Sequence, residues 1–305
     1  MSFLYFLEGL RNPALDAFFA AVTHAGEETL FIVFGMLLFW CVSKKHGYYL
    51  LLVSFAGTII NQFLKLWFRI PRPWVRDPEF TIVESARAEA TGYSFPSGHT
   101  QMSVGMYGSL ARSFAHPIVR CVCIALCVLV PFSRMYLGVH YPSDVLVSVA
   151  IALILVFALH PLVMRAVDEP KRMRRIFAVL AAMTAAHLLF VHLYPFPADI
   201  DMHNYESSVK NGFTMLGCLL GLWVTYEADT RYIRFSTEGS LRVQAVKLIV
   251  GFALLMGIRA ALKAPLRALF AGSLFSDCVR YFIMVVFAGC IWPLTFPYIR
   301  RIMEK

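Results

Sequence analysis

Three short polar segments interrupt a strongly apolar chain, and each carries side chains that could do acid–base or nucleophilic chemistry. They are KLWFRIPRP at residues 65–73, PSGH at 96–99 and SRMYLGVHYPSD at 133–144. Ionisable groups within or beside apolar segments are costly, so by default they indicate a functional site. We therefore expect these three segments to act together.

The first property that the segments share is positive charge. Lys65, Arg72 and Arg134 supply three cations, without an equal number of acidic side chains beside them. A guanidinium group matches the oxygens of a phosphate with two parallel hydrogen bonds. Either Lys65 or Arg72 alone could simply extend to the lipid headgroups. Together with Arg134, they favour a polyanionic ligand.

The PSGH segment has the pattern of a helix start. Ser97 can cap the helix, and Gly98 allows a ligand to approach the backbone closely. The free N–H groups of such a start, together with the helix dipole, bind anions. A capping serine by itself is common. His99 directly behind it, near three cations, favours a phosphate site.

The third segment places a histidine four residues before an aspartate. Pro142 can begin a helix, so that Asp144 lies in its first turn within reach of His140. A carboxylate that accepts from one ring N–H makes the other nitrogen a better nucleophile. His99 has no acidic neighbour in the sequence. We therefore predict that His140 attacks phosphorus and that His99 is the general acid; the alternative for the pair is a structural hydrogen bond.

Two histidines and three cations around one phosphate describe phosphoryl transfer through a phosphohistidine, which water then hydrolyses. The cations would neutralise the charge that a metal ion neutralises in other enzymes, so we expect no metal and no cofactor. One other tract, residues 198–207, could contact a metal through Asp199, Asp201 and His203. A solvated outer loop explains that tract as well.

The composition defines the elements that must position these segments. The chain has 305 residues, 59% of them hydrophobic and 15% charged, whereas soluble domains are about half apolar and about a quarter charged. We predict an all-α, polytopic membrane helical bundle with about nine spans. The expected spans are residues 27–42, 47–68, 99–115, 118–138, 143–164, 175–194, 212–227, 243–262 and 279–298.

Charge in the loops predicts the topology. The loops at 43–47, 111–120 and 168–175 are basic and should face the cytoplasm, whereas 69–98 balances its arginines with acids such as Glu89. This topology places the three polar segments on the outer face. Lys263 and Arg267 do not fit it, because these basic residues would also lie on the outer side. Because much of the net charge of +9 lies in such loops, membrane lipids are the expected partners and nucleic acid is not. The N-terminal segment lacks the features of a cleaved secretory signal and is expected to form an interfacial helix.

The motif spacing resembles that of the type 2 phosphatidic acid phosphatase (PAP2) superfamily: K-x6-R-P, then P-S-G-H, then S-R-x5-H-x3-D. The resemblance implies an integral membrane helical bundle that removes phosphate from lipid phosphates without a metal. It implies His140 as nucleophile, Asp144 as its orienting partner and His99 as acid. It implies that the phosphate is held by Lys65, Arg72, Ser97, Gly98, His99 and Arg134.

The resemblance also implies three parts: an N-terminal interfacial region at 1–26, a catalytic core at 27–167 and a membrane extension at 168–305. The resemblance is to a bacterial branch of the family, so the expected location is the cell membrane, at the bacterial inner membrane, and the charge of the loops predicts that the site faces outward. Expected substrates are undecaprenyl diphosphate, phosphatidic acid, phosphatidylglycerol phosphate and sphingoid-base phosphates.

Other functions remain alternatives at this point. A lipid phosphotransferase would use the same site with a lipid acceptor in place of water. A non-enzymatic phospholipid binder or transporter would need the cations but not an oriented nucleophile. A haloperoxidase, which shares the phosphate-site pattern, is disfavoured by the membrane composition. The sequence leaves the physiological lipid, the role of the extension and the oligomeric state open.

Overall fold

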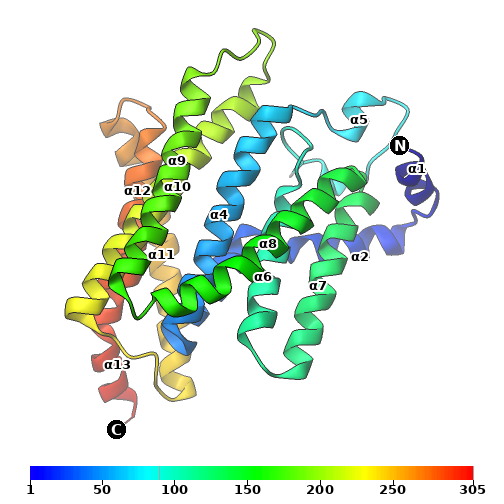
Figure 1. Ribbon diagram of the computed structural model, residues 1–305. Helices are drawn as coiled ribbons and strands as arrows, with labels where there is room; N and C mark the ends of the chain where they lie inside the picture. The colour runs from blue at the N-terminus through cyan, green and yellow to red at the C-terminus, as the bar shows by residue number, and fades with distance from the viewer. Residues whose placement is uncertain (89, 305) are drawn as a thin grey trace. The chain divides into compact units, whose positions relative to one another are not determined.

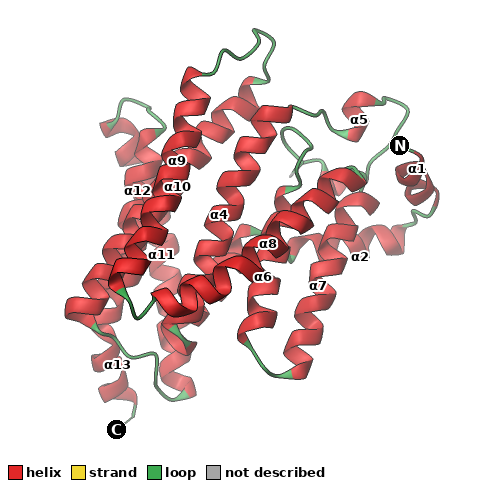
Figure 2. Ribbon diagram, in the orientation of Figure 1, coloured by secondary structure: helices red, strands yellow, loops and turns green. Residues whose placement is uncertain are grey.

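The protein is all-helical, as the sequence predicts. A computed structural model describes residues 1–88 and 90–304, and Glu89 and Lys305 lie outside the described residues. Within that part of the chain, helices are joined by loops and turns and no strand occurs (Figures 1 and 2). The polar segments therefore have to be positioned by helix ends and by the loops between helices.

Fewer helices can cross a membrane than the nine that the sequence predicts. Among the described residues, six helical stretches are long and apolar enough, or seven if a pair bent by 45° counts as one span. The six are α4 (Lys44–Phe68, continued to Arg76), α7 (Pro117–Tyr136), α8 (Pro142–Ala166), α9 (Pro170–Leu193), α11 (Leu241–Leu269) and Phe275–Met303, which contains α12 (Phe275–Val286) and α13 (Phe296–Met303). The bent pair joins α2 (Pro13–His24) to the stretch Glu28–Val42, which begins with α3 (Glu28–Leu37).

Two predicted spans form helices that do not meet this test. One is α6 (Gly98–Ser113), which has only 16 residues, whereas about 20 apolar residues are needed to span a bilayer. The other is α10 (Met202–Ala228), whose first turns are polar. Buried polar side chains of α6 include Thr100, Gln101, Ser103 and Ser109. The count of about nine spans was therefore too high, because apolar runs were counted without regard to these polar positions.

The N-terminal region forms two helices where one interfacial helix was expected. The first helix, α1 (Ser2–Gly9), ends before Asn12, whose side chain accepts a hydrogen bond of 3.0 Å from the Leu15 N–H. Pro13 occupies the first position of α2, where its missing N–H costs nothing, so the chain starts a new helix here. Both helices pack against α7, and Phe19 contacts Tyr136 with ring centroids 4.3 Å apart.

The described chain divides into two compact units that do not follow the order of the sequence. The first comprises Met1–Phe31, Tyr49–Leu162 and Phe196–Ser208, and the second comprises Ile32–Tyr48, Val163–Pro195 and Val209–Lys305. All three polar segments lie in the first unit. Residues 196–208 also belong to the first unit, although they follow a long segment of the second unit in the sequence.

Within the first unit, a helical hairpin and a long loop carry the polar segments. Figure 1 shows α6 and α7 joined as a hairpin, and the two helices pack against each other. The loop after α5 (Pro73–Arg76) is attached through the Val83 N–H, which donates to the carbonyl of Leu137 at 3.1 Å. Phe80 and Ile82 are buried against Tyr141. These contacts hold the loop beside the segment that contains His140.

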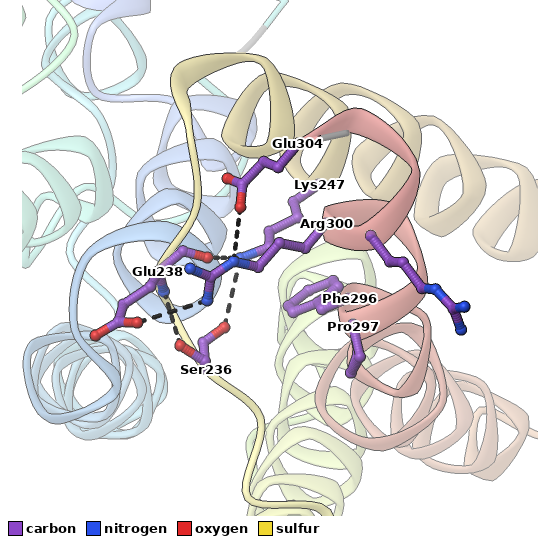
Figure 3. Close-up of a pocket in the computed structure, with 8 residues that line it drawn as sticks. Ser236, Glu238, Lys247, Phe296, Pro297, Arg300 and Glu304 are labelled. Atoms are coloured by element: carbon purple, nitrogen blue, oxygen red, sulfur yellow. Dashed lines mark hydrogen bonds and ion pairs between the residues drawn. The ribbon is translucent and has the colours of Figure 1, made fainter.

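The second unit contains a cavity of about 500 Å³ beside a buried lysine (Figure 3). Lys247 of α11 is 1% exposed, and its ammonium donates to the carbonyl oxygens of Glu238 at 2.8 Å and Ser236 at 3.4 Å. The same ammonium lies 4.7 Å from the ring centroid of Phe296. Arg300 forms ion pairs with Glu304 and Glu238. The charges drawn in Figure 3 therefore hold helix ends and a loop together within this unit.

Candidate active site

The three polar segments meet around one cavity of about 160 Å³ in the first unit, called the polar cavity below. Five of the eight predicted site residues line it: Lys65, Arg72, Gly98, His99 and His140. The other three are fully buried and do not line it: Ser97, Arg134 and Asp144. Segments up to about 80 residues apart in the sequence thus contribute to one site.

Arg72 is held in one orientation by backbone carbonyls. It is 6% exposed and donates from Nε to Gly92 at 2.9 Å, from Nη2 to Thr91 at 2.7 Å and from Nη1 to Val139 at 2.8 Å. The side chain therefore does not extend to the lipid headgroups. Lys65 is held similarly, because its ammonium donates to the carbonyl of Tyr93 at 2.6 Å.

The contacts of His140 define which ring nitrogen carries the proton. Its Nε2 lies 3.0 Å from Nη1 of Arg72, and its Nδ1 lies 3.3 Å from Oδ2 of Asp144. A guanidinium group can only donate hydrogen bonds, so Nε2 is the acceptor and Nδ1 carries the hydrogen. This tautomer directs the lone pair of Nε2 toward Arg72, beside the polar cavity. It is the tautomer that a nucleophilic histidine needs.

The surroundings of His140 also favour its neutral form. Burial lowers the pKa of His140 well below its ordinary value, and the positive charges of Arg72 and Arg134 lower that pKa further. His140 lies in the turn between α7 and α8, outside both helices. Near neutral pH the imidazole therefore keeps the lone pair that nucleophilic attack requires.

Asp144 is fixed by a set of donors that the sequence does not reveal. Its Oδ2 accepts from the hydroxyl of Ser94 at 2.5 Å and from the N–H of Tyr141 at 2.9 Å, besides the contact with His140. Ser94 is itself completely buried, and its N–H donates to the carbonyl of Ile70 at 2.8 Å. The hydrogen bonds from Ser94 and Tyr141 thus orient the carboxylate of Asp144, which in turn orients His140.

The PSGH segment starts α6, as predicted. The hydroxyl of Ser97 accepts from the N–H of Thr100 at 3.4 Å, and Gly98 and His99 form the first turn beside the polar cavity. A Cβ atom at Gly98 would find no heavy atom closer than Asn61 Oδ1 at 4.0 Å, so it would project into open space. Glycine therefore leaves room for a ligand to approach the helix start, where N–H groups favour an anion.

Arg134 lies behind the wall of the polar cavity. It is 0% exposed, and its Nη1 donates to the hydroxyl of Thr23 in α2 at 2.5 Å. Arg134 therefore contributes a buried positive charge and does not itself line the cavity. Thr23, which ties Arg134 to the N-terminal region, is a second residue that sequence reasoning missed.

A second cavity, of about 460 Å³, is also lined by His99. It shares Gln62, Gly98 and His99 with the polar cavity and is otherwise lined by residues of α3, α4, α6 and the turn after α2, among them Glu27 and Glu28. His99 thus lines both cavities.

Part of the tract at residues 198–207 also lines the polar cavity. The expectation of a solvated loop holds for Asp199, which is exposed, but not for Asn204, which is 9% exposed. Among the described residues, no group of three or more His, Cys, Asp or Glu side chains comes together as a metal site. The lining residues from this part of the chain are His203, Asn204, Ser207 and Ser208.

Comparison with known families agrees with the motif pattern. The profile described as "PAP2 superfamily" matches residues 46–168, and the profile described as "PAP2 superfamily phosphatase, transmembrane extension" matches residues 213–302. The chain belongs to the PAP2 superfamily. It is accordingly a phosphoric ester hydrolase and a multi-pass membrane protein.

Two curated relatives come from Bacillus subtilis. Undecaprenyl-diphosphatase BcrC is 32% identical over 152 residues, which cover 48% of this chain and 74% of that protein. Phosphatidylglycerophosphatase B is 30% identical over 161 residues, with 48% of this chain and 75% of that protein covered. Among solved structures, that of Aquifex aeolicus LpxE matches with a TM-score of 0.46 and 24% identity, covering 52% of this chain and 92% of that one.

Proposed function

We propose that this protein is a membrane lipid phosphatase that forms a phosphohistidine at His140. The observation that carries the proposal is the pair of contacts on the His140 ring: Nδ1 against Asp144 at 3.3 Å and Nε2 against Arg72 at 3.0 Å. A phospholipid binder has no use for a neutral imidazole oriented in this way. A nucleophile requires it.

In the first step, the phosphate of the lipid lies in the polar cavity. Lys65, Arg72 and the N–H groups at the start of α6 bind its oxygens, and the buried charge of Arg134 adds to their attraction. Nη1 of Arg72 then donates its hydrogen bond to a phosphate oxygen and no longer to Nε2 of His140. Burial and the nearby cations lower the pKa of His99 to about 3, so in this proposal the bound phosphate, whose negative charge offsets those cations, lets His99 take up a proton. Nε2 attacks phosphorus, the bond from phosphorus to the leaving oxygen breaks, and the protonated His99 gives that oxygen its proton.

In the second step, a water molecule attacks the phosphohistidine. His99 is now neutral and takes a proton from the water, while the bond between phosphorus and Nε2 breaks and restores His140. Inorganic phosphate leaves the polar cavity. The cations of the chain supply the charge neutralisation that the transition state needs, so the proposed reaction uses no metal.

The position of His99 supports its role as acid. It lines both the polar cavity and the second cavity, so it lies where a phosphate in the first would be joined to a leaving group in the second. Among the described residues, those that line the polar cavity include no aspartate and no glutamate. Both features suit a substrate whose anionic phosphate lies in the polar cavity and whose remaining part extends toward the membrane lipid.

The proposed substrates are lipid monophosphates and diphosphates, such as undecaprenyl diphosphate, phosphatidic acid and sphingoid-base phosphates. The names of the two Bacillus relatives support this class. We further propose that the protein lies in a bacterial inner membrane with the polar cavity facing outward. Its proposed parts are an interfacial region at 1–26, a catalytic core at 27–167 and a membrane extension at 168–305.

A direct test uses the purified full chain in detergent with EDTA and a panel of these lipids. The wild type is expected to release inorganic phosphate from at least one lipid, and His140→Ala to release none. Wild type quenched at alkaline pH, where the bond between phosphorus and nitrogen is stable, should carry a phosphate on His140. The proposal is wrong if no lipid yields phosphate or if His140→Ala turns over normally. Product analysis by mass would show a phosphorylated lipid acceptor if the enzyme transfers phosphate instead.

A further inference from the structure

The start of α10 belongs to the same unit as the phosphate site, although it lies far along the chain. Residues 196–208 group with the first unit, and they lie between the two stretches that match the family profiles, 46–168 and 213–302. The first two turns of α10 supply His203, Asn204, Ser207 and Ser208 to the wall of the polar cavity. None of these positions belongs to the three motif segments.

Asn204 makes the most specific of these contacts. Its side-chain oxygen accepts a hydrogen bond of 2.8 Å from the N–H of Tyr93. A Cβ atom added to Gly92 would lie 2.1 Å from the same oxygen, and Gly92 has a φ of +80°, where glycine is favoured. The backbone at residues 92–93 therefore fits closely against Asn204.

That backbone also orients the two cations that line the polar cavity. The carbonyl of Gly92 accepts from Nε of Arg72 at 2.9 Å, and the carbonyl of Tyr93 accepts from the ammonium of Lys65 at 2.6 Å. A shift of residues 92–93 would move both acceptors at once. Asn204 is thus one hydrogen bond away from the groups that hold both cations.

The helix start that carries Asn204 is itself attached to the same backbone. The carboxylate of Asp201 accepts from the N–H of Asn204 at 3.1 Å, as a helix cap does. The N–H of Asp201 donates to the hydroxyl of Tyr93 at 3.4 Å. Two separate contacts therefore connect the start of α10 to Tyr93.

We propose that Asn204 is a positioning residue of the phosphate site, and that the first two turns of α10 form a wall of that site. Asn204 acts through residues 92–93 on Arg72 and Lys65, and it sets the spacing of these cations for a tetrahedral oxyanion. The inference rests on the proposed function, since it takes the polar cavity as the place where the substrate phosphate binds.

The test measures binding of tungstate, a tetrahedral oxyanion, to the full chain in detergent by isothermal titration calorimetry. Asn204→Ala removes the acceptor for Tyr93 and is expected to raise the Kd about tenfold. Asn204→Asp keeps an acceptor but brings a negative charge to the cavity wall, so its Kd should rise further. Glu206→Ala is the matched control, because Glu206 is exposed on the same turn and does not line the cavity.

A double-mutant cycle separates positioning from a general structural role. If Asn204 acts through the cations, Asn204→Ala combined with Arg72→Lys should weaken tungstate binding by clearly less than the product of the two single effects. Melting temperatures of Asn204→Ala and Glu206→Ala should stay close to that of the wild type. A purely structural role would lower the melting temperature and give independent effects on Kd.

The proposal is overturned if Asn204→Ala and Asn204→Asp bind tungstate as the wild type does, or if Glu206→Ala weakens binding equally. Should Asn204→Ala fail to fold, Asn204→Leu decides the outcome, since it fills a similar space but removes the acceptor for the Tyr93 N–H. Binding is measured without turnover. A wild type that binds tungstate but releases no phosphate from lipids would therefore contradict the proposed function and leave this inference standing.

Discussion

Nη1 of Arg72 and Nε2 of His140 lie 3.0 Å apart at the polar cavity. Because the guanidinium only donates, this contact places the lone pair of His140 on Nε2 and the hydrogen on Nδ1, where Asp144 accepts it. One arginine thus has two proposed tasks: it selects the tautomer of the nucleophile before the substrate binds, and it binds a phosphate oxygen afterwards.

Replacing Arg72 by lysine tests both tasks. The planar fork makes contacts with three carbonyls that a single ammonium cannot reproduce. Hydrogen bonds to charged groups contribute roughly 1.5–3 kcal/mol each, so we expect kcat/KM for a lipid phosphate to fall about 10- to 100-fold in Arg72→Lys. Steady-state phosphate release measures the change. Unchanged kcat/KM would remove Arg72 from the proposed site.

Ser94 should matter for turnover although no motif contains it. Its hydroxyl donates to the carboxylate of Asp144 at 2.5 Å, so Ser94→Ala leaves that carboxylate with one donor fewer. We expect kcat to fall about tenfold or more, with a smaller change in KM. Ser85→Ala is the control, because Ser85 is an exposed serine of the preceding loop. Equal effects of the two variants would contradict an orienting role for Ser94.

The pH dependence of kcat/KM reports on His140 in the free enzyme. Burial first, and then the charges of Arg72 and Arg134, lower its pKa well below the ordinary value. A lowered pKa preserves the neutral, nucleophilic imidazole as the pH falls, so the acid limb of kcat/KM should lie clearly below about 6.5. The profile is measured between about pH 4 and 8 and corrected for the separately titrated ionisation of the substrate phosphate. An acid limb at or above that value would contradict the prediction.

Lys247 should stabilise the second unit without affecting the phosphate site. Lys247→Met keeps the apolar stem but leaves the carbonyls of Ser236 and Glu238 without their donor (Figure 3). We expect a loss of about 1–3 kcal/mol in stability, visible as a lower apparent melting temperature, with KM unchanged. Arg301→Ala is the control, since Arg301 lines the same cavity but is exposed. An equal loss of stability in Arg301→Ala would contradict a specific stabilising role for Lys247.

The PAP2 motif spacing was sufficient to predict the family and the all-helical fold, and five of the eight site residues that it indicated line the polar cavity. The reason is that much of this information is local. Pro142 begins α8, so His140 and Asp144 approach each other within one turn, and Ser97 caps α6 directly before His99. The positions of the helices also follow from apolar runs, although the number that can span a membrane does not, because α6 and α10 carry polar residues.

Only the tertiary structure decided which distant residues complete the site. Ser94 lies 50 residues before Asp144, Arg134 lies 111 residues after Thr23, and Asn204 lies 111 residues after Tyr93. Sequence spacing predicts contacts within a helical turn, because the helix repeats every 3.6 residues. It carries no such information across separations of 50 or 111 residues, where tertiary contacts set the distances. The motifs therefore predict the chemistry, and the tertiary packing determines which residues hold the proposed site in place.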